Sequence, residues 1–119
     1  MKKIFNKLVR DKMIDVWKYD IENKISASGY SAKYIPQEET LERLKDKLLE
    51  ESQEVFESYT DDVKLKEELA DVIEVIDGII FHKGFTLEEV LKIKEAKKVK
   101  KGGFEKGLYL ESIDYFDKE

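Results

Sequence analysis

The chain has 119 residues and contains no cysteine, one proline and one histidine. Without cysteine it can form no disulfide bond, thiolate metal site or cysteine nucleophile, and it is compatible with a reducing cytosol. Its apolar runs are far shorter than the roughly 20 residues that span a membrane. The N-terminal sequence MKKIFNKLVRDK also lacks the apolar core of a signal peptide. We therefore expect a cytoplasmic protein that does not act in a membrane.

Basic residues are scarce relative to acidic ones. The net charge is -5 and the isoelectric point is near 5.1, which argues against a nucleic-acid polymer as partner. Charged and hydrophobic residues each make up 41% of the chain. This balance is typical of a globular domain whose helices have charged faces. No internal repeat or linker interrupts the sequence, so we expect a single domain over residues 1–119.

Apolar residues recur at the three-to-four spacing of a helix face and predict four helices. Their expected ranges are 11–26, 38–58, 63–82 and 86–101. Short turns separate the last three helices, which favours antiparallel packing. Residues 30–35 and 107–112 alternate weakly and predict two short strands that pair with each other. The expected fold is all-α, an antiparallel bundle of about four helices with a minor two-stranded β element.

Two acidic motifs lie inside the second and third expected helices, namely Glu50-Glu51-x-x-Glu54 and Glu68-x-x-Asp71. At 100° per residue, Glu51 falls about 20° from Leu44 and about 40° from Val55, inside the apolar stripe. Glu68 falls about 40° from Val72 and lies inside the stripe of its own helix. In each helix a second acid, three residues further along, lies on the shoulder of the stripe. A carboxylate on a core-facing stripe is costly unless something compensates its charge.

Antiparallel packing would bring four carboxylates into one cleft, those of Glu51, Glu54, Glu68 and Asp71. They would repel one another when ionised, and a divalent cation relieves this repulsion. Hard oxygen ligands select Mg²⁺, Mn²⁺ or Ca²⁺ rather than Zn²⁺. A lone glutamate in a stripe is more often solvated at an acidic rim, but two matched pairs favour a metal site. We predict these four residues as ligands of Mg²⁺, with Mn²⁺ as an alternative.

Basic residues provide a counterpart to the acidic motifs. Lys97 and Lys101 fall within about 20° of Val90, on the continuation of an apolar stripe. They are interpreted either as the end of a helix that extends past the core or as ligands of phosphate oxygens. Arg10 is a further candidate phosphate ligand, although an exposed charge is the simpler interpretation from composition. His82 ends a helix and is interpreted as capping carbonyl groups rather than as catalytic.

The EExxE and ExxD motifs on consecutive helices resemble the all-α NTP pyrophosphohydrolase superfamily, the MazG-like group. Four blocks of sequence carry the resemblance in this order: Asn6 to Lys12, Leu48 to Glu54, Glu67 to Asp77, and Lys100 to Phe104. They look like the branch of house-cleaning NTP pyrophosphatases that is also labelled phosphoribosyl-ATP pyrophosphohydrolase-like. The resemblance covers nearly the whole chain. It implies the same four Mg²⁺ ligands, basic positions at Lys97 and Lys101, and a homodimer or homotetramer. Relatives often carry arginine where this chain has Lys101, and lysine offers a point charge instead of a bidentate fork.

The sequence therefore predicts a Mg²⁺-dependent nucleoside triphosphate pyrophosphohydrolase, which releases a nucleoside monophosphate and pyrophosphate in nucleotide-pool house-cleaning. Glu50 or Glu54 would accept the proton of the attacking water, and Glu50 is favoured if Glu54 binds metal. Arg10, Lys97 and Lys101 would hold phosphate oxygens. Two alternatives stay open. One is the phosphoribosyl-ATP pyrophosphohydrolase of histidine biosynthesis. The other is a non-catalytic helical protein that binds metal or nucleotide for assembly.

Overall fold

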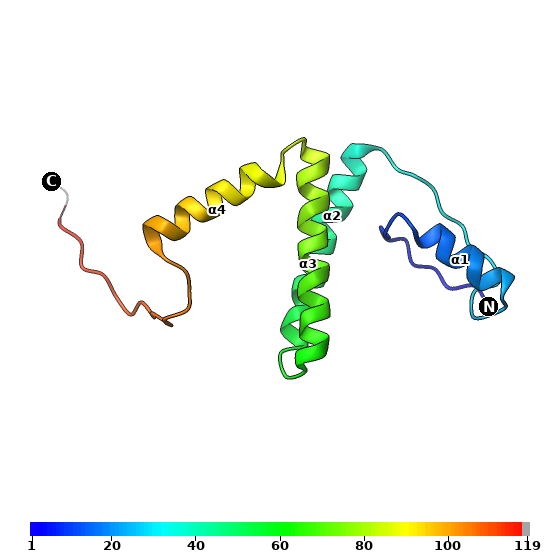
Figure 1. The fold of residues 1–119 in the computed structure, drawn as a ribbon, viewed down its shortest axis with the longest axis horizontal. Helices are drawn as coiled ribbons and strands as arrows, with labels where there is room; N and C mark the ends of the chain where they lie inside the picture. The colour runs from blue at the N-terminus through cyan, green and yellow to red at the C-terminus, as the bar shows by residue number, and fades with distance from the viewer. Residues whose placement is uncertain (118–119) are drawn as a thin grey trace. The chain divides into compact units, whose positions relative to one another are not determined.

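The computed structural model describes residues 1–117, which form four α-helices and no β-strand. The helices are α1 (Met13–Glu22), α2 (Gln37–Glu57), α3 (Asp62–Lys83) and α4 (Leu87–Lys101) (Figure 1). The all-α prediction is confirmed, and each expected helix is present, with α1 shorter at both ends than expected. The predicted β element of 30–35 and 107–112 is wrong, since both segments are irregular. An isolated two-stranded pair is marginally stable, and weak alternation does not overcome this.

The chain divides into two units, Met1–Thr86 and Leu87–Glu119. The first unit contains α1, α2 and α3, and the second contains α4 and the irregular segment that follows it. The single domain expected over residues 1–119 stays a prediction. No helix within residues 1–117 has the length and apolar character needed to cross a membrane.

Helices α2 and α3 pack side by side as an antiparallel hairpin, which holds the buried core of the first unit (Figure 1). Leu44 of α2 and Val75 and Ile80 of α3 are its buried apolar residues. Gly78 allows the close approach, because a Cβ at this position would lie 3.2 Å from Leu44 Cδ2. This contact sets the register of the two helices. Glu51 and Asp71 each lie seven residues closer to the α2–α3 turn than Leu44 and Gly78 do. The two acidic motifs therefore lie opposite each other.

The ends of α3 follow the signals in its sequence. Asp61 is the N-cap residue, and its side-chain Oδ1 accepts a hydrogen bond from the Lys64 backbone N–H at 3.2 Å. At the other end Gly84 adopts a left-handed conformation with φ of 75°, which glycine reaches without steric cost.

The buried face of α3 is rotated from the expected one. Val75 is the buried centre at 6% exposure, whereas Leu69 and Ile76 are 45% and 39% exposed. At 100° per residue, Leu69, Ile73 and Ile76 lie about 100° to 160° from Val75. The apolar surface of α3 is therefore wider than its contact with α2, and part of it stays exposed in the described structure.

The N-terminal part of the first unit consists of α1 and the irregular segments on either side of it. No residue of α1 is buried. The Trp17 and Tyr30 rings lie 5.3 Å apart, and Asp20 accepts a hydrogen bond from the Ser26 hydroxyl at 2.8 Å. These contacts fold the connection after α1 back onto the helix. The irregular segment before α1 ends where the Met13 N–H donates to the Arg10 carbonyl at 3.1 Å.

The second unit consists of α4 and an irregular segment. Gly102 follows the last residue of α4 and has φ of 85°, a left-handed conformation that glycine adopts readily. Lys97 and Lys101 are exposed on this helix. Lys98 forms an ion pair with Glu105 at 3.8 Å, which ties the start of the irregular segment to the last turn of α4.

Candidate metal and phosphate site

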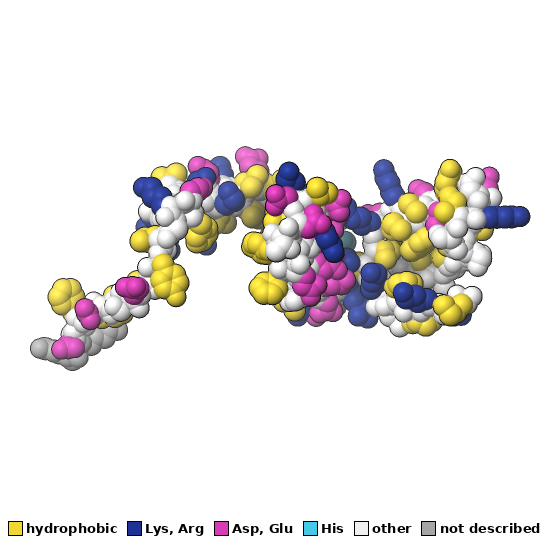
Figure 2. Space-filling view, turned by 90° about the horizontal axis from the view of Figure 1, so that it is seen from below, with side chains coloured by type: hydrophobic (Ala, Val, Ile, Leu, Met, Phe, Trp, Pro, Cys, Tyr) yellow, Lys and Arg dark blue, Asp and Glu magenta, His cyan; other side chains and the backbone are white. Residues whose placement is uncertain are grey.

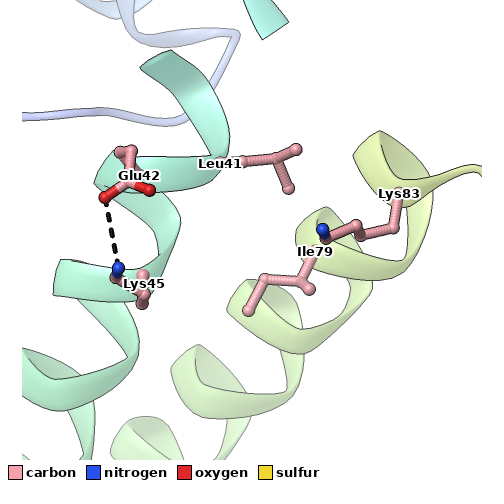
Figure 3. A pocket seen from close by; sticks show the side chains of 5 residues that line it. All are labelled: Leu41, Glu42, Lys45, Ile79 and Lys83. Atoms are coloured by element: carbon pink, nitrogen blue, oxygen red, sulfur yellow. Dashed lines mark ion pairs between the residues drawn. The ribbon is translucent and has the colours of Figure 1, made fainter. Parts of the chain in front are cut away.

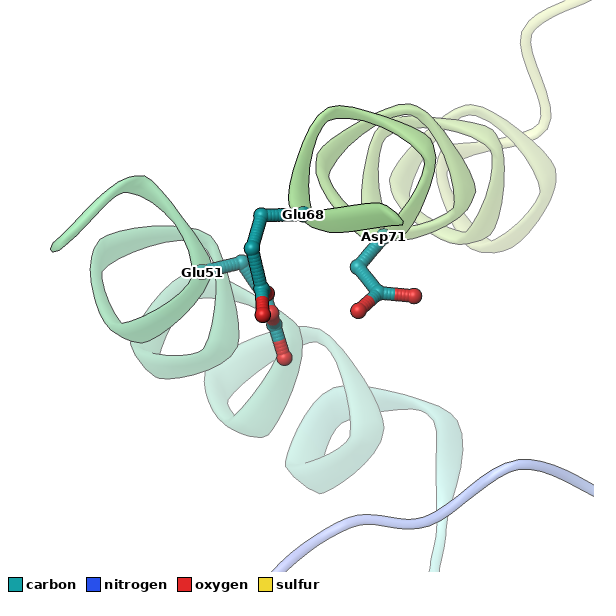
Figure 4. Close-up of side chains that lie close together, drawn as sticks. All are labelled: Glu51, Glu68 and Asp71. Atoms are coloured by element: carbon teal, nitrogen blue, oxygen red, sulfur yellow. The ribbon is translucent and has the colours of Figure 1, made fainter. Parts of the chain in front are cut away.

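Three carboxylates converge where the two acidic motifs meet. Glu51 comes from α2, and Glu68 and Asp71 come from α3 (Figure 4). Each offers one oxygen, and these oxygens all lie within 4.8 Å of one another. The antiparallel register explains the convergence, because it sets Glu51 opposite Asp71. Three of the four predicted ligands are thus brought together.

Two oxygens of this cluster are buried without a hydrogen-bond partner, Glu51 Oε2 and Glu68 Oε2. Glu51 is itself one of the most buried residues described, at 8% exposure. Lys47 compensates part of this charge, since its Nζ lies 3.8 Å from Glu51 Oε1, but the second oxygen receives nothing. A buried carboxylate oxygen without a partner costs free energy. Carboxylate oxygens so placed fit a hard divalent cation such as Mg²⁺.

The pKa shifts in the cluster also indicate crowded negative charge. A hydrogen bond with the Glu54 side chain, burial, and the charges of Glu54, Asp71 and Glu51 raise the pKa of Glu68 to about 7. Burial and the charge of Glu54 raise the pKa of Glu51, against the lowering effect of Lys47. A bound divalent cation would offset this negative charge.

Arg10 reaches the cluster from the N-terminal segment. Its Nη2 donates to Asp71 Oδ1 at 2.7 Å, a short charge-assisted contact between residues 61 positions apart. The two side chains are partly exposed, so the pair is worth little as a source of stability. The contact joins the N-terminal segment to the carboxylate cluster.

A cleft of about 510 Å³ lies between this segment and the α2–α3 hairpin. Its lining includes three cations, Arg10, Lys12 and Lys47, and four carboxylates, Asp11, Glu51, Asp71 and Glu74. Figure 2 shows carboxylates gathered on the hairpin and lysine and arginine side chains on the neighbouring N-terminal part. The volume is within the range of roughly 300–1,000 Å³ that small-molecule sites have.

The remaining predicted residues have different positions. Glu54, the fourth expected ligand, is half-buried and within hydrogen-bond reach of Glu51 and Glu68. Glu50 is exposed on α2. Lys97 and Lys101 belong to the second unit, so their expected role at the carboxylates stays a prediction.

Sequence reasoning missed Lys47 and Glu74. The helical phase contains the signal for Lys47, which falls about 40° from Glu51 and thus within the same stripe. Glu74 of α3 lies outside the two acidic motifs, yet it lines the cleft. The rotation of α3 and the N-terminal segment bring that side of the helix to the cleft, and neither is visible in the spacing of apolar residues.

A second, smaller hollow of about 180 Å³ lies on the hairpin near the start of α2 and the end of α3 (Figure 3). Its polar residues are Glu42, Lys45 and Lys83. Glu42 and Lys45 form an ion pair at 3.2 Å with both side chains about 70% exposed, at 71% and 69%. A solvated pair of this kind neutralises its own charge, so this hollow lacks the uncompensated carboxylates of the larger cleft.

Comparison with family models, with curated proteins and with solved structures finds no match for this chain. The resemblance to the MazG-like group therefore rests on the motifs alone. The arrangement of the carboxylates, the cations and the cleft is the basis for a functional proposal.

Proposed function

We propose that the protein is a Mg²⁺-dependent nucleoside triphosphate pyrophosphohydrolase, which cleaves the α–β phosphoanhydride to a nucleoside monophosphate and pyrophosphate. The observation that carries this proposal is the convergence of Glu51, Glu68 and Asp71 with buried, unpartnered oxygens. A cleft with cations on its wall adjoins them. Carboxylates for a metal beside cations for phosphate oxygens are the combination that a polyphosphate substrate requires.

The metal ligands would be Glu51, Glu68 and Asp71, with Glu54 completing the set from its adjoining position. Bound Mg²⁺ supplies positive charge to phosphate oxygens and lowers the pKa of a coordinated water. The donor set fits the ion, because every residue in it offers carboxylate oxygens, and Glu51 Oε2 and Glu68 Oε2 are buried without a hydrogen-bond partner.

The chain's own residues have two further tasks. Arg10 and Lys47, on the cleft wall, hold phosphate oxygens and stabilise the charge that moves onto the leaving pyrophosphate. Glu54 or Glu50 accepts the proton of the attacking water, and Glu50 takes this role if Glu54 binds metal. Lys97 and Lys101 of α4 are proposed as further phosphate ligands.

Pyrophosphate release by charge-neutral variants tests this function. Glu51→Gln and Glu68→Gln keep the side-chain shape and remove one ligand charge each, so both should lose at least about 100-fold in turnover. Glu67→Gln is the matched control, since Glu67 is an exposed neighbour on the same helix. The proposal is wrong if both ligand variants release pyrophosphate as fast as the wild-type protein in Mg²⁺.

A substrate panel addresses the chemistry of the nucleotide. We propose NTPs of the cytoplasmic nucleotide pool as substrates, and the panel includes modified NTPs and phosphoribosyl-ATP. Turnover confined to phosphoribosyl-ATP would assign the protein to histidine biosynthesis instead. Nucleotide binding without any pyrophosphate release would indicate a non-catalytic binding protein.

The exposed apolar residues of the hairpin support a homodimer. Leu49 and Phe56 of α2 are each 72% exposed, and Ile73 of α3 is 60% exposed. Burial of such side chains against a second copy would stabilise the pair by about 25 cal/mol per Å² of apolar surface. The mass in solution, from light scattering, should be that of a dimer or tetramer, and Ile73→Glu should reduce it to that of one chain. A wild-type mass of one chain would contradict the assignment.

A further inference from the structure

The cleft between the N-terminal segment and the hairpin has two chemically different ends. One end carries Glu51, Lys47 and Asp71, and Arg10 is paired with Asp71. From Asp71 the α3 lining runs through Gly78 to His82. At 1.5 Å per residue these positions lie about 10 Å and about 16 Å along the helix from Asp71. The cleft is therefore an elongated groove with a charged end and a distal end.

The distal end is built from different side chains. Thr40 and His82 lie there, four residues beyond Leu44 and Gly78 on their helices, and the apolar side chains of Leu8, Val9, Leu44 and Val75 line the groove as a whole. His82 is a half-buried ring on the same wall and offers nitrogen atoms for hydrogen bonding. Apolar side chains with a few polar groups are the usual surroundings of a nucleoside. Gly78 lies in the middle of the groove. Because it has no side chain, α3 packs closely on Leu44 there and no side chain at position 78 projects into the groove.

We infer that this groove binds the whole nucleotide in one direction, with the polyphosphate at Lys47 and Arg10 and the nucleoside towards His82. The inference deepens the proposed function and rests on it for the identity of the ligand class. Lys47 is the central phosphate contact, because its side chain is only 20% exposed and its Nζ lies 3.8 Å from Glu51 Oε1. Arg10 is the more exposed phosphate contact, at 60% side-chain exposure.

The charge of the groove makes binding dependent on a divalent cation. Four carboxylates against three cations line it, so a polyphosphate anion meets a net negative site. One divalent cation on the carboxylates offsets two of these negative charges. The ligand of the groove is thus a metal–nucleotide complex and not the free nucleotide.

Calorimetry with two probes tests the direction of binding. The probes are α,β-methylene-ATP, which resists α–β cleavage, and inorganic tripolyphosphate, each titrated with and without Mg²⁺. Lys47→Met should weaken binding of both probes about 10- to 100-fold, the effect of one charge-assisted hydrogen bond. His82→Ala should weaken the nucleotide probe about two- to tenfold and leave tripolyphosphate unchanged. Without Mg²⁺ neither probe should bind measurably.

Lys45→Met is the matched control for Lys47→Met. Lys45 is two residues away on α2, about 200° around the helix, and pairs with the exposed Glu42. Thermal melting of each variant checks that it folds. Arg10→Met is a second variant at the phosphate end of the groove, at an exposed position. It should also weaken binding of both probes.

Three results would overturn the groove assignment. They are unchanged binding of both probes in Lys47→Met and Arg10→Met, an equal effect of His82→Ala on tripolyphosphate, and no nucleotide binding by the wild-type protein in Mg²⁺. The assignment and the proposed function fail separately. A protein that binds both probes as expected but releases no pyrophosphate retains the groove and loses the enzymatic function. If the protein releases pyrophosphate but none of these variants changes probe binding, the enzymatic function is retained and the groove assignment is lost.

Discussion

Replacing Glu51 by glutamine should remove most of the stabilisation that Mg²⁺ gives to the folded protein. Glu51 is 8% exposed, and its Oε2 has no hydrogen-bond partner, so a bound cation is the group that would compensate it. A ligand that binds only the folded state stabilises it by RT ln(1 + [L]/Kd), which is about 2.7 kcal/mol at 100 times Kd. If the variant binds Mg²⁺ about 100-fold more weakly, the gain at the same concentration falls to about 0.4 kcal/mol.

These free energies correspond to measurable melting shifts. An unfolding entropy of about 2.1 cal/mol/K per residue gives roughly 250 cal/mol/K for a chain of 119 residues. The wild-type Tm should therefore rise by about 11 °C on saturation with Mg²⁺, and that of Glu51→Gln by about 2 °C. Differential scanning calorimetry with Glu67→Gln as control measures both. Equal shifts in Glu51→Gln and wild-type protein would refute the assignment of Glu51 as a ligand.

Three other predictions concern the hairpin. The raised pKa of Glu68, about 7 against an ordinary 4.5, means that the folded protein binds more protons than the unfolded one between these values. The free energy of unfolding of the metal-free protein should therefore fall as pH rises from about 4.5 to about 7. Urea unfolding at a series of pH values measures this, and Glu68→Gln should flatten the dependence. A rise in wild-type stability over this window would contradict the raised pKa. Leu44→Ala should cost about 2–5 kcal/mol in urea unfolding, and a loss under 1 kcal/mol would contradict the packing on Gly78. Asp61→Ala should cost about 1 kcal/mol through the lost N-cap, with no change expected in Mg²⁺ affinity.

The sequence contains enough information to predict the helices and most of the acidic cluster. Helix positions follow from apolar spacing and from local signals such as Asp61 and Gly84, which act within one turn. Glu51 and Glu68 could be recognised because a carboxylate inside an apolar stripe is anomalous wherever the partner helix lies. Antiparallel packing, which the short turn favours, puts the two motifs on facing helices.

Other features depend on contacts that are distant in sequence. The apolar surface of α3 covers an arc from Val75 to Ile73, and spacing alone cannot say which part of it faces α2. The contact of Gly78 with Leu44 decides that question, and it appears only when the helices are packed. The pairing of Arg10 with Asp71 joins residues 61 positions apart, so no local pattern reveals it. The predicted strands failed for the opposite reason, because a weak local alternation found no partner.

The most direct test of the central claim is the identification of products by ³¹P NMR after incubation with a nucleoside triphosphate and Mg²⁺. The carboxylate cluster and the adjoining cations predict nucleoside monophosphate and pyrophosphate in equal amounts, with no product when Mg²⁺ is chelated and at least about 100-fold slower formation by Glu68→Gln. A nucleoside diphosphate with inorganic phosphate, or turnover that persists in the chelator, would contradict a metal-assisted pyrophosphohydrolase at this site.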